Sequence, residues 1–235
     1  MGNYLIIIDS RIPIPIQKRL LEFGELLQIP PLSGYSAISA HPDIYLCQGE
    51  EKLIVSPDLP EPHIRRLREA VKADVVIGDS KIGSHYPLTA KYNAVISGNY
   101  LICNSRIIDS SVISLNKNRQ LIDIKQGYTR CNLLPLSNER FITGDRGIQR
   151  RLEEKNFKVF FIEDQTKIRL DGFTHGFIGG TAGTMGQHIF FTGSLKQLIG
   201  GEQMIHELKE DKYEIHALSD DPPIDVGSIL FMEKK

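Results

Sequence analysis

One cysteine and one histidine are the residues of this chain best suited to covalent chemistry. Cys131 stands beside Arg130, and His175 follows in a later, glycine-rich stretch. An ionised thiol is a strong nucleophile near neutral pH, and a neighbouring cation lowers the pKa at which it ionises. Cys131 and His175 therefore raise the hypothesis of a cysteine hydrolase. The alternative is a buried, inert thiol: if residues 131 and 132 lie on a strand, alternation turns Cys131 away from whatever Asn132 faces.

A second set of polar residues recurs at one position of an internal repeat. At a period of roughly 45 residues, a polar residue or a glycine precedes an apolar strand, which favours a closed ring whose matched positions meet on one axis. Two carboxylates there would hold a cation, and two amides would orient it. The structural alternative is that such residues satisfy backbone groups at strand starts or adopt unusual dihedrals. The matched residues are Asp43, Asn93, Asn132, Gly180 and Asp225.

The segment from Gly172 to Gly183 has the highest glycine density of the chain. Free backbone N–H groups near Gly179 and Gly180 would suit an anion such as a carboxylate or phosphate. The Lys-Ser/Thr ending of a Walker phosphate loop is missing. Close backbone packing around a crowded axis explains the glycines equally well.

Metal ligands are scattered through the chain. His41, Asp43, His175 and Asp225 come from different repeats, and no closely spaced pair of histidines or cysteines supports a metal centre. We therefore expect no metal and no other cofactor.

Each repeat is predicted to run helix, strand, turn, strand, hairpin, strand. Pro15 and Pro62 suit the first turn of a helix, and Asp145 can cap another. Strands are predicted to pass through Asp43–Leu46 and Asn132–Leu134. A weak helix is predicted around Asp109–Leu115 and a further helix around Met204–Leu208. A Gly-aromatic pair marks three turns, at Gly34-Tyr35, Gly127-Tyr128 and Gly172-Phe173. No Pro/Gly/Ser-rich linker interrupts the series, so residues 1–235 are predicted to form a single domain.

The composition narrows the class of protein. A hydrophobic content of 41% and a charged content of 24% are those of a soluble globular chain with a sizeable core. The net charge of −1 favours no nucleic-acid partner. The opening run Met1–Asp9 reads as a strand rather than a signal peptide, and no apolar run is long enough to span a membrane. Three cysteines do not make a disulfide framework, so we expect a reducing cytoplasm.

The repeat resembles the pentein superfamily, the five-bladed β/α propellers. This superfamily includes arginine and agmatine deiminases, amidinotransferases, dimethylarginine hydrolases and a ribosome anti-association initiation factor. The resemblance covers essentially the whole chain as a pattern of blades. A narrower resemblance, carried by Gly127–Asn132 and Gly176–Gly180, is to uncharacterised bacterial proteins with a guanidino-modifying-enzyme fold. It implies an α/β propeller of about five pseudo-symmetric blades around a central channel.

The resemblance also implies a chemistry, from which this chain departs. In the enzymes of the superfamily, a cysteine near the C-terminus attacks a guanidinium carbon, a histidine from another blade is the acid/base, and carboxylates hold the cation. Here the last repeat reads Asp225-Val226-Gly227-Ser228, without a cysteine, and Thr174-His175-Gly176 lacks the acid of the histidine motif.

The leading hypothesis is a small-molecule site in the channel, for a polar or cationic ligand of guanidino, amidino or amino-acid-like type. Asp43 and Asp225 would hold the ligand, and the amides of Asn93 and Asn132 with the segment Gly179-Gly180 would orient it. An enzyme of this kind would act on a C–N bond as a hydrolase or amidinotransferase. The rival hypothesis is a non-enzymatic binding protein with a sealed channel. The sequence carries no signal for an oligomeric state.

Overall fold

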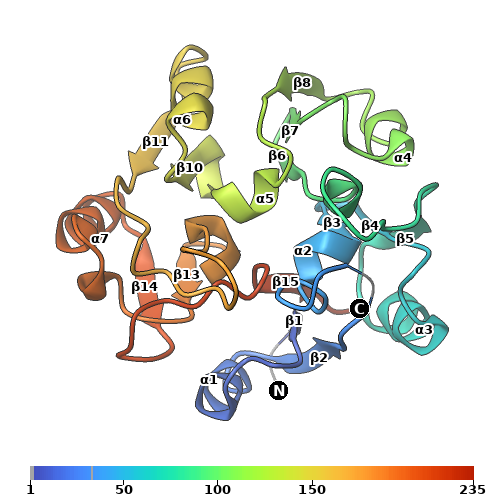
Figure 1. The fold of residues 1–235 in the computed structure, drawn as a ribbon, viewed down its shortest axis with the longest axis horizontal. Coiled ribbons are helices and arrows are strands. Elements are labelled where there is room, and N and C mark those ends of the chain that lie inside the picture. The colour runs from blue at the N-terminus through green and yellow to red at the C-terminus, as the bar shows by residue number, and fades with distance from the viewer. Residues whose placement is uncertain (1–2, 33) are drawn as a thin grey trace.

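In the computed structural model, which describes residues 3–32 and 34–235, five three-stranded sheets are arranged in a ring (Figure 1). Every sheet has an inner strand, a middle strand antiparallel to it, and an outer strand parallel to the middle one. The inner strands adjoin one another around the axis. From inner to outer, the sheets are β3 (Leu46–Gln48), β4 (Lys52–Val55) and β5 (Asp74–Ile77); β6 (Val95–Ser97), β7 (Tyr100–Cys103) and β8 (Gln120–Asp123); β9 (Leu133–Leu136), β10 (Arg140–Thr143) and β11 (Lys158–Phe161); β12 (Ala182–Met185), β13 (His188–Phe191) and β14 (Glu214–Ala217); and β15 (Leu230–Glu233), β1 (Tyr4–Asp9) and β2 (Glu25–Ile29).

The two ends of the chain close the ring. The C-terminal strand β15 pairs antiparallel with β1, with Tyr4 opposite Glu233 and Ile7 opposite Leu230. A blade therefore begins at an inner strand and ends after a helix and an outer strand. The predicted repeat has the right elements but the wrong boundary, because its helix and first strand belong to one blade and its last two strands to the next. Met1 and Gly2, at the start of the predicted first strand, lie outside the described residues.

Helices on the outside of the ring connect the middle strand of each blade to its outer strand (Figure 1). Pro15 lies in the first turn of its helix, and Asp145 caps another by accepting N–H bonds from Gly147 at 2.7 Å and Ile148 at 2.9 Å. The four longer helices each bury one apolar stripe against their sheet, as the sequence pattern predicts. These helices are α1 (Ile14–Leu20), α3 (Glu61–Ala70), α4 (Ser110–Ser114), α6 (Arg146–Glu153) and α7 (Gly201–Glu210).

Short helical turns precede several inner strands, where extended chain was predicted. Asp43 lies in α2 (Pro42–Tyr45) and Asn132 in α5 (Thr129–Asn132), so the strands begin only at Leu46 and Leu133. A similar 3₁₀ turn, η3 (Ile178–Thr181), precedes β12, and η1 (Leu88–Ala90) lies shortly before Asn93. Every residue of α2, α5 and η3 is buried, and a short buried run without alternation is compatible with strand or helix. The predicted strand starts were therefore wrong.

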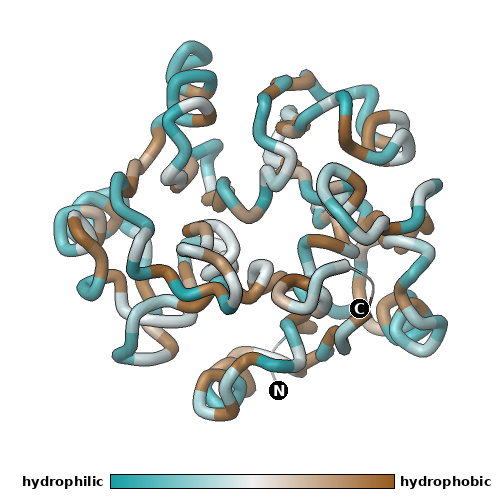
Figure 2. Tube along the Cα trace, in the orientation of Figure 1, coloured by the Kyte–Doolittle hydropathy of each residue, from teal (hydrophilic) through white to brown (hydrophobic). Residues whose placement is uncertain are grey.

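The core lies between neighbouring sheets and between the sheets and their helices. Figure 2 shows hydrophilic stretches along outer elements such as α6 and hydrophobic stretches inside the ring. Phe190 of β13 and Phe231 of β15 join two blades, with ring centroids 4.7 Å apart. Among the described residues, none of the helices is long and apolar enough to cross a membrane.

Candidate functional site

A buried cluster of polar side chains fills the axis just before the inner strands. Asp43 Oδ2 accepts hydrogen bonds from the hydroxyl of Ser228 at 2.7 Å and the thiol of Cys131 at 3.1 Å. Each of these three side chains is at most 5% exposed. They come from three blades, so Asp43 links distant parts of the chain at the centre of the propeller.

Asn93 ties the same cluster to the backbone of two turns. Its Nδ2 donates to the carbonyl of Asp43 at 3.0 Å, and its Oδ1 accepts the N–H of Arg130 at 2.6 Å. Asn132 behaves differently, because its amide donates to Tyr128 O within its own turn at 2.9 Å. The matched ring therefore converges only in part. Ser228 was not predicted as an axial residue, and the glycine that precedes it in the sequence is the signal that could have identified it.

Asp225 is buried beside the cluster. It faces the side of the ring opposite the hairpins that join the inner and middle strands, which we call the loop side. Its Oδ2 accepts the N–H of Phe177 at 2.9 Å, and its Oδ1 accepts that of Gly227 at 3.0 Å. Burial raises the pKa of this carboxyl, and the nearby charge of His41 opposes that shift. His41 Nδ1 lies 3.9 Å from Asp225 Oδ1, and its Nε2 lies 3.9 Å from Asp9 Oδ2. All three residues line a loop-side cavity of about 310 Å³.

The thiol of Cys131 faces the axis, not the packing between blades. The predicted orientation assumed a strand, whereas residues 129–132 form a helical turn that presents Cys131 to Asp43. Burial, and after it the carboxylate of Asp43, raises the pKa of this thiol well above its ordinary value. His175 bonds to the carbonyl of Gly176 at 2.8 Å and contacts the ring of Phe177. Within the described chain, Cys131 and His175 make no contact with each other, and catalysis by this pair stays a prediction.

Iodoacetamide will leave Cys131 unmodified in the folded protein at pH 7, because the thiol is protonated and enclosed. Burial also raises the pKa of Cys47 and of Cys103 to about 12. Raised thiol pKa values stabilise the folded state below the unfolded pKa of about 8.5, and that stability is lost as pH rises through the folded pKa. The free energy of unfolding should therefore fall above about pH 8.5. Mass spectrometry of iodoacetamide-treated protein, with urea-unfolded protein as the positive control, tests the labelling prediction. Stoichiometric labelling of Cys131 in the native protein would contradict it.

The glycine segment packs against the axis. A side chain on Gly180 would overlap the carboxylate of Asp225, and one on Gly179 would overlap the carbonyl of Arg130. The N–H of Gly180 already donates to Phe177 O at 3.0 Å. Close packing therefore accounts for glycine at both positions.

Arg130 carries a buried positive charge on the opposite, hairpin side of the cluster. It is 6% exposed, and its guanidinium donates to the carbonyls of Gly179 at 2.8 Å and Ala182 at 3.1 Å. Burial lowers its pKa, yet an arginine stays protonated in proteins. In the described part of the chain, no carboxylate lies within ion-pair distance of this group. Sequence reasoning considered Arg130 only as a neighbour of Cys131.

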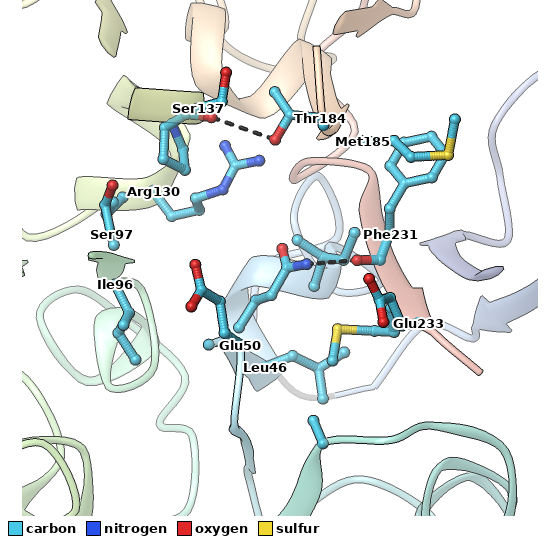
Figure 3. A pocket seen from close by; sticks show the side chains of 18 of the residues that line it. Leu46, Glu50, Ile96, Ser97, Arg130, Ser137, Thr184, Met185, Phe231 and Glu233 are labelled. Atoms are coloured by element: carbon cyan, nitrogen blue, oxygen red, sulfur yellow. Dashed lines mark hydrogen bonds between the residues drawn. The ribbon is translucent and has the colours of Figure 1, made fainter. Parts of the chain in front are cut away.

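The guanidinium borders a cavity of about 560 Å³ at the hairpin ends of the inner strands. All five blades contribute to its wall, so it lies on the axis. Figure 3 shows Arg130 and Glu50 projecting into it from different sides. Its other polar side chains include Gln48, Ser97, Ser137 and Thr184.

Five blades of this topology around a polar axis define the pentein fold, and the predicted propeller architecture is confirmed. The chain is similar in structure to the dimethylarginine dimethylaminohydrolase of Pseudomonas aeruginosa in complex with citrulline, with a TM-score of 0.55, 8% identity, and 94% of this chain and 93% of that chain covered. It is similar to the N-terminal domain of ArgZ, a cyanobacterial arginine dihydrolase bound to its substrate, with a TM-score of 0.53, 11% identity, and 91% and 90% covered. It is also similar to SxtG, an amidinotransferase of Microseira wollei, with a TM-score of 0.52, 10% identity, and 96% and 94% covered.

The sequence itself gives the family. A family profile matches residues 7–230, and the chain belongs to that family, which is described as a family of unknown function, DUF6873. No curated protein matches the chain in sequence.

Proposed function

We propose that the protein binds a small amino-acid-like molecule in the axial cavity and that Arg130 binds the ligand's carboxylate. The observation that carries this proposal is a buried, permanently charged guanidinium that borders the cavity. Among the described residues, its hydrogen bonds go to two carbonyl groups, and the charges of Asp43 and Asp225 act on it without forming an ion pair. A buried charge is costly unless it is paired. An arginine offers five N–H donors in a planar fork, which matches a carboxylate in a bidentate manner.

The other end of the ligand is proposed to be cationic. Glu50 lines the same cavity and is exposed, whereas Glu233 is already paired with Lys72 at 2.9 Å. Glu50 would therefore receive a guanidino, amidino or amino group. A volume of about 560 Å³ lies within the range of small-molecule sites. Citrulline and arginine, named for two structural neighbours, belong to this ligand class.

The proposed function is binding without thiol chemistry. The last repeat carries no cysteine, and its Ser228 hydroxyl is buried and donates to Asp43 Oδ2 at 2.7 Å. Cys131 is a protonated donor to Asp43. This arrangement supports the rival hypothesis of a non-enzymatic binding protein.

A second candidate site is the loop-side cavity, whose wall holds the carboxylates of Asp9, Asp171 and Asp225 together with Arg11 and Arg169. Asp225, buried and neighboured by His41, forms part of its wall, and the exposed Asp171 lines it as well. A guanidinium there would pair with carboxylates. Asp43 is fully buried and is not among the residues that line this cavity.

Calorimetric titration with pairs of ligands that differ only in the carboxylate separates the two sites. L-arginine should bind at least about 10-fold more tightly than agmatine, and L-ornithine more tightly than putrescine, because only the amino acids pair with Arg130. Glu50→Gln should weaken both amino acids, and Asp225→Asn should leave them unchanged. If the amino acid and its decarboxylated partner bind with equal affinity, and Asp225→Asn abolishes that binding, the ligand occupies the loop-side cavity instead. Absence of binding by arginine, ornithine and citrulline would contradict the proposal.

A further inference from the structure

Two neighbouring parallel strands place three metal-ligating side chains on one face of a sheet. In the register of β13 and β14, His188 lies opposite Glu214, and Phe190 lies opposite His216. Alternate residues of a strand share a face, so both histidines and the glutamate project to the same side. The sequence separates the histidines by 28 residues, which is why no closely spaced pair predicted this group.

The donor atoms of the three side chains lie close together. His188 Nδ1 lies 3.0 Å from His216 Nε2 and 3.4 Å from Glu214 Oε2, and His216 Nε2 lies 3.4 Å from Glu214 Oε1. One atom from each residue can be chosen so that all three lie within 4.8 Å of one another. Tetrahedral zinc with bonds of about 2.0–2.1 Å requires ligand atoms roughly 3.3–3.4 Å apart. The separations of 3.0–3.4 Å between these side chains are close to that spacing.

Packing holds the deeper histidine in place. The ring of His216 stacks on Phe190 with centroids 4.5 Å apart and planes 10° apart, and Phe23 contacts its edge at 5.3 Å.

We propose that His188, His216 and Glu214 form a binding site for a divalent transition-metal ion, zinc in particular. Two histidines and one glutamate are a known zinc ligand set, and such three-ligand sites leave the fourth position open. The side chains are 38%, 20% and 64% exposed respectively, so a metal ion and a water molecule can reach them from solvent. The site lies on the β13–β14 sheet and uses none of the residues of the proposed ligand cavity.

Titration of the tag-free protein with Zn²⁺ by calorimetry, and with Co²⁺ by visible absorption, tests this site. The expected result is one equivalent of either metal, with Co²⁺ giving the intense visible bands of a tetrahedral complex. His188→Asn and His216→Asn should each lower the affinity at least 10-fold, and Glu214→Gln should lower it as well.

The matched control is His206→Asn. His206 lies 3.8 Å from Glu210 on α7 and is 75% exposed, so it offers a histidine and a carboxylate without the third ligand. This variant should bind one equivalent as the unchanged protein does. If the histidine pair only stabilises the sheet, the unchanged protein will bind no metal, or all four variants will bind metal with the same affinity. Either result overturns the proposal. Circular dichroism of each variant confirms that the fold is retained.

Discussion

Replacing Arg130 with methionine will remove binding of the amino-acid ligands and leave the fold in place. Truncating one partner of a buried charge pair costs about 2–5 kcal/mol, which corresponds to an affinity loss of roughly 30-fold or more. Methionine fills much of the same volume but leaves the carbonyls of Gly179 and Ala182 without their donor, so we also expect a stability loss of about 1–3 kcal/mol. Arg130→Lys keeps the charge but loses the planar fork, so it should bind with an intermediate affinity.

Calorimetric titration with L-arginine and urea unfolding measure the two effects separately. Arg65→Met on α3 is the matched control, because Arg65 is exposed and lies outside the cavity. Its affinity and its urea midpoint should equal those of the unchanged protein. Arginine binding that survives Arg130→Met in a folded protein would disprove the role of Arg130. If Arg130→Met does not fold, Arg130→Lys takes its place in the titration. An affinity of Arg130→Lys equal to that of the unchanged protein would then disprove the role of Arg130.

Replacing Asp43 with alanine will produce the largest loss of stability among the axial residues. Asp43 is fully buried, and its Oδ2 is the acceptor for both Cys131 and Ser228. The substitution leaves the thiol of Cys131 without that partner and opens a void, and together these effects cost about 2–4 kcal/mol. Urea denaturation should show this as a lower midpoint with an unchanged slope.

Asp74→Ala is the control for Asp43→Ala, since Asp74 is exposed on the outer strand β5 and should change stability by less than about 0.5 kcal/mol. The double variant Asp43→Ala/Ser228→Ala should cost less than the sum of its single changes, because both act on one hydrogen bond. A loss for Asp43→Ala as small as that of the control would show that the axial cluster contributes little to stability.

Local sequence patterns were sufficient for the outer parts of each blade. Pro15, Pro62 and Asp145 marked helix starts correctly, because first-turn and capping preferences act within a few residues. The strands β2 (Glu25–Ile29) and β5 (Asp74–Ile77) follow the same local logic, since each is a short apolar run beside a helix. The recurrence of these elements was enough to predict a five-bladed ring.

The residues of the candidate site were harder to predict from the sequence than the outer helices and strands. The repeat identified Asp43 and Asn93 as axial residues, and both lie in the cluster. It also matched Asn132, whose side chain bonds within its own turn, and it passed over Ser228. A repeat aligns backbone positions, whereas the direction of each side chain depends on the local turn and on contacts with other blades.

By itself, the sequence determined the number of blades, the outer helices and the place where polar residues meet. The tertiary structure decided the closure of the ring by β15 and β1, the direction of Cys131 towards Asp43, and the position of Arg130 beside the cavity. The physical reason is the same in each case. Helix caps and apolar stripes are local and are written in neighbouring residues, whereas a short buried turn such as Thr129–Asn132 takes its conformation from the blades packed around it. The axial site therefore exists only once all five blades have assembled.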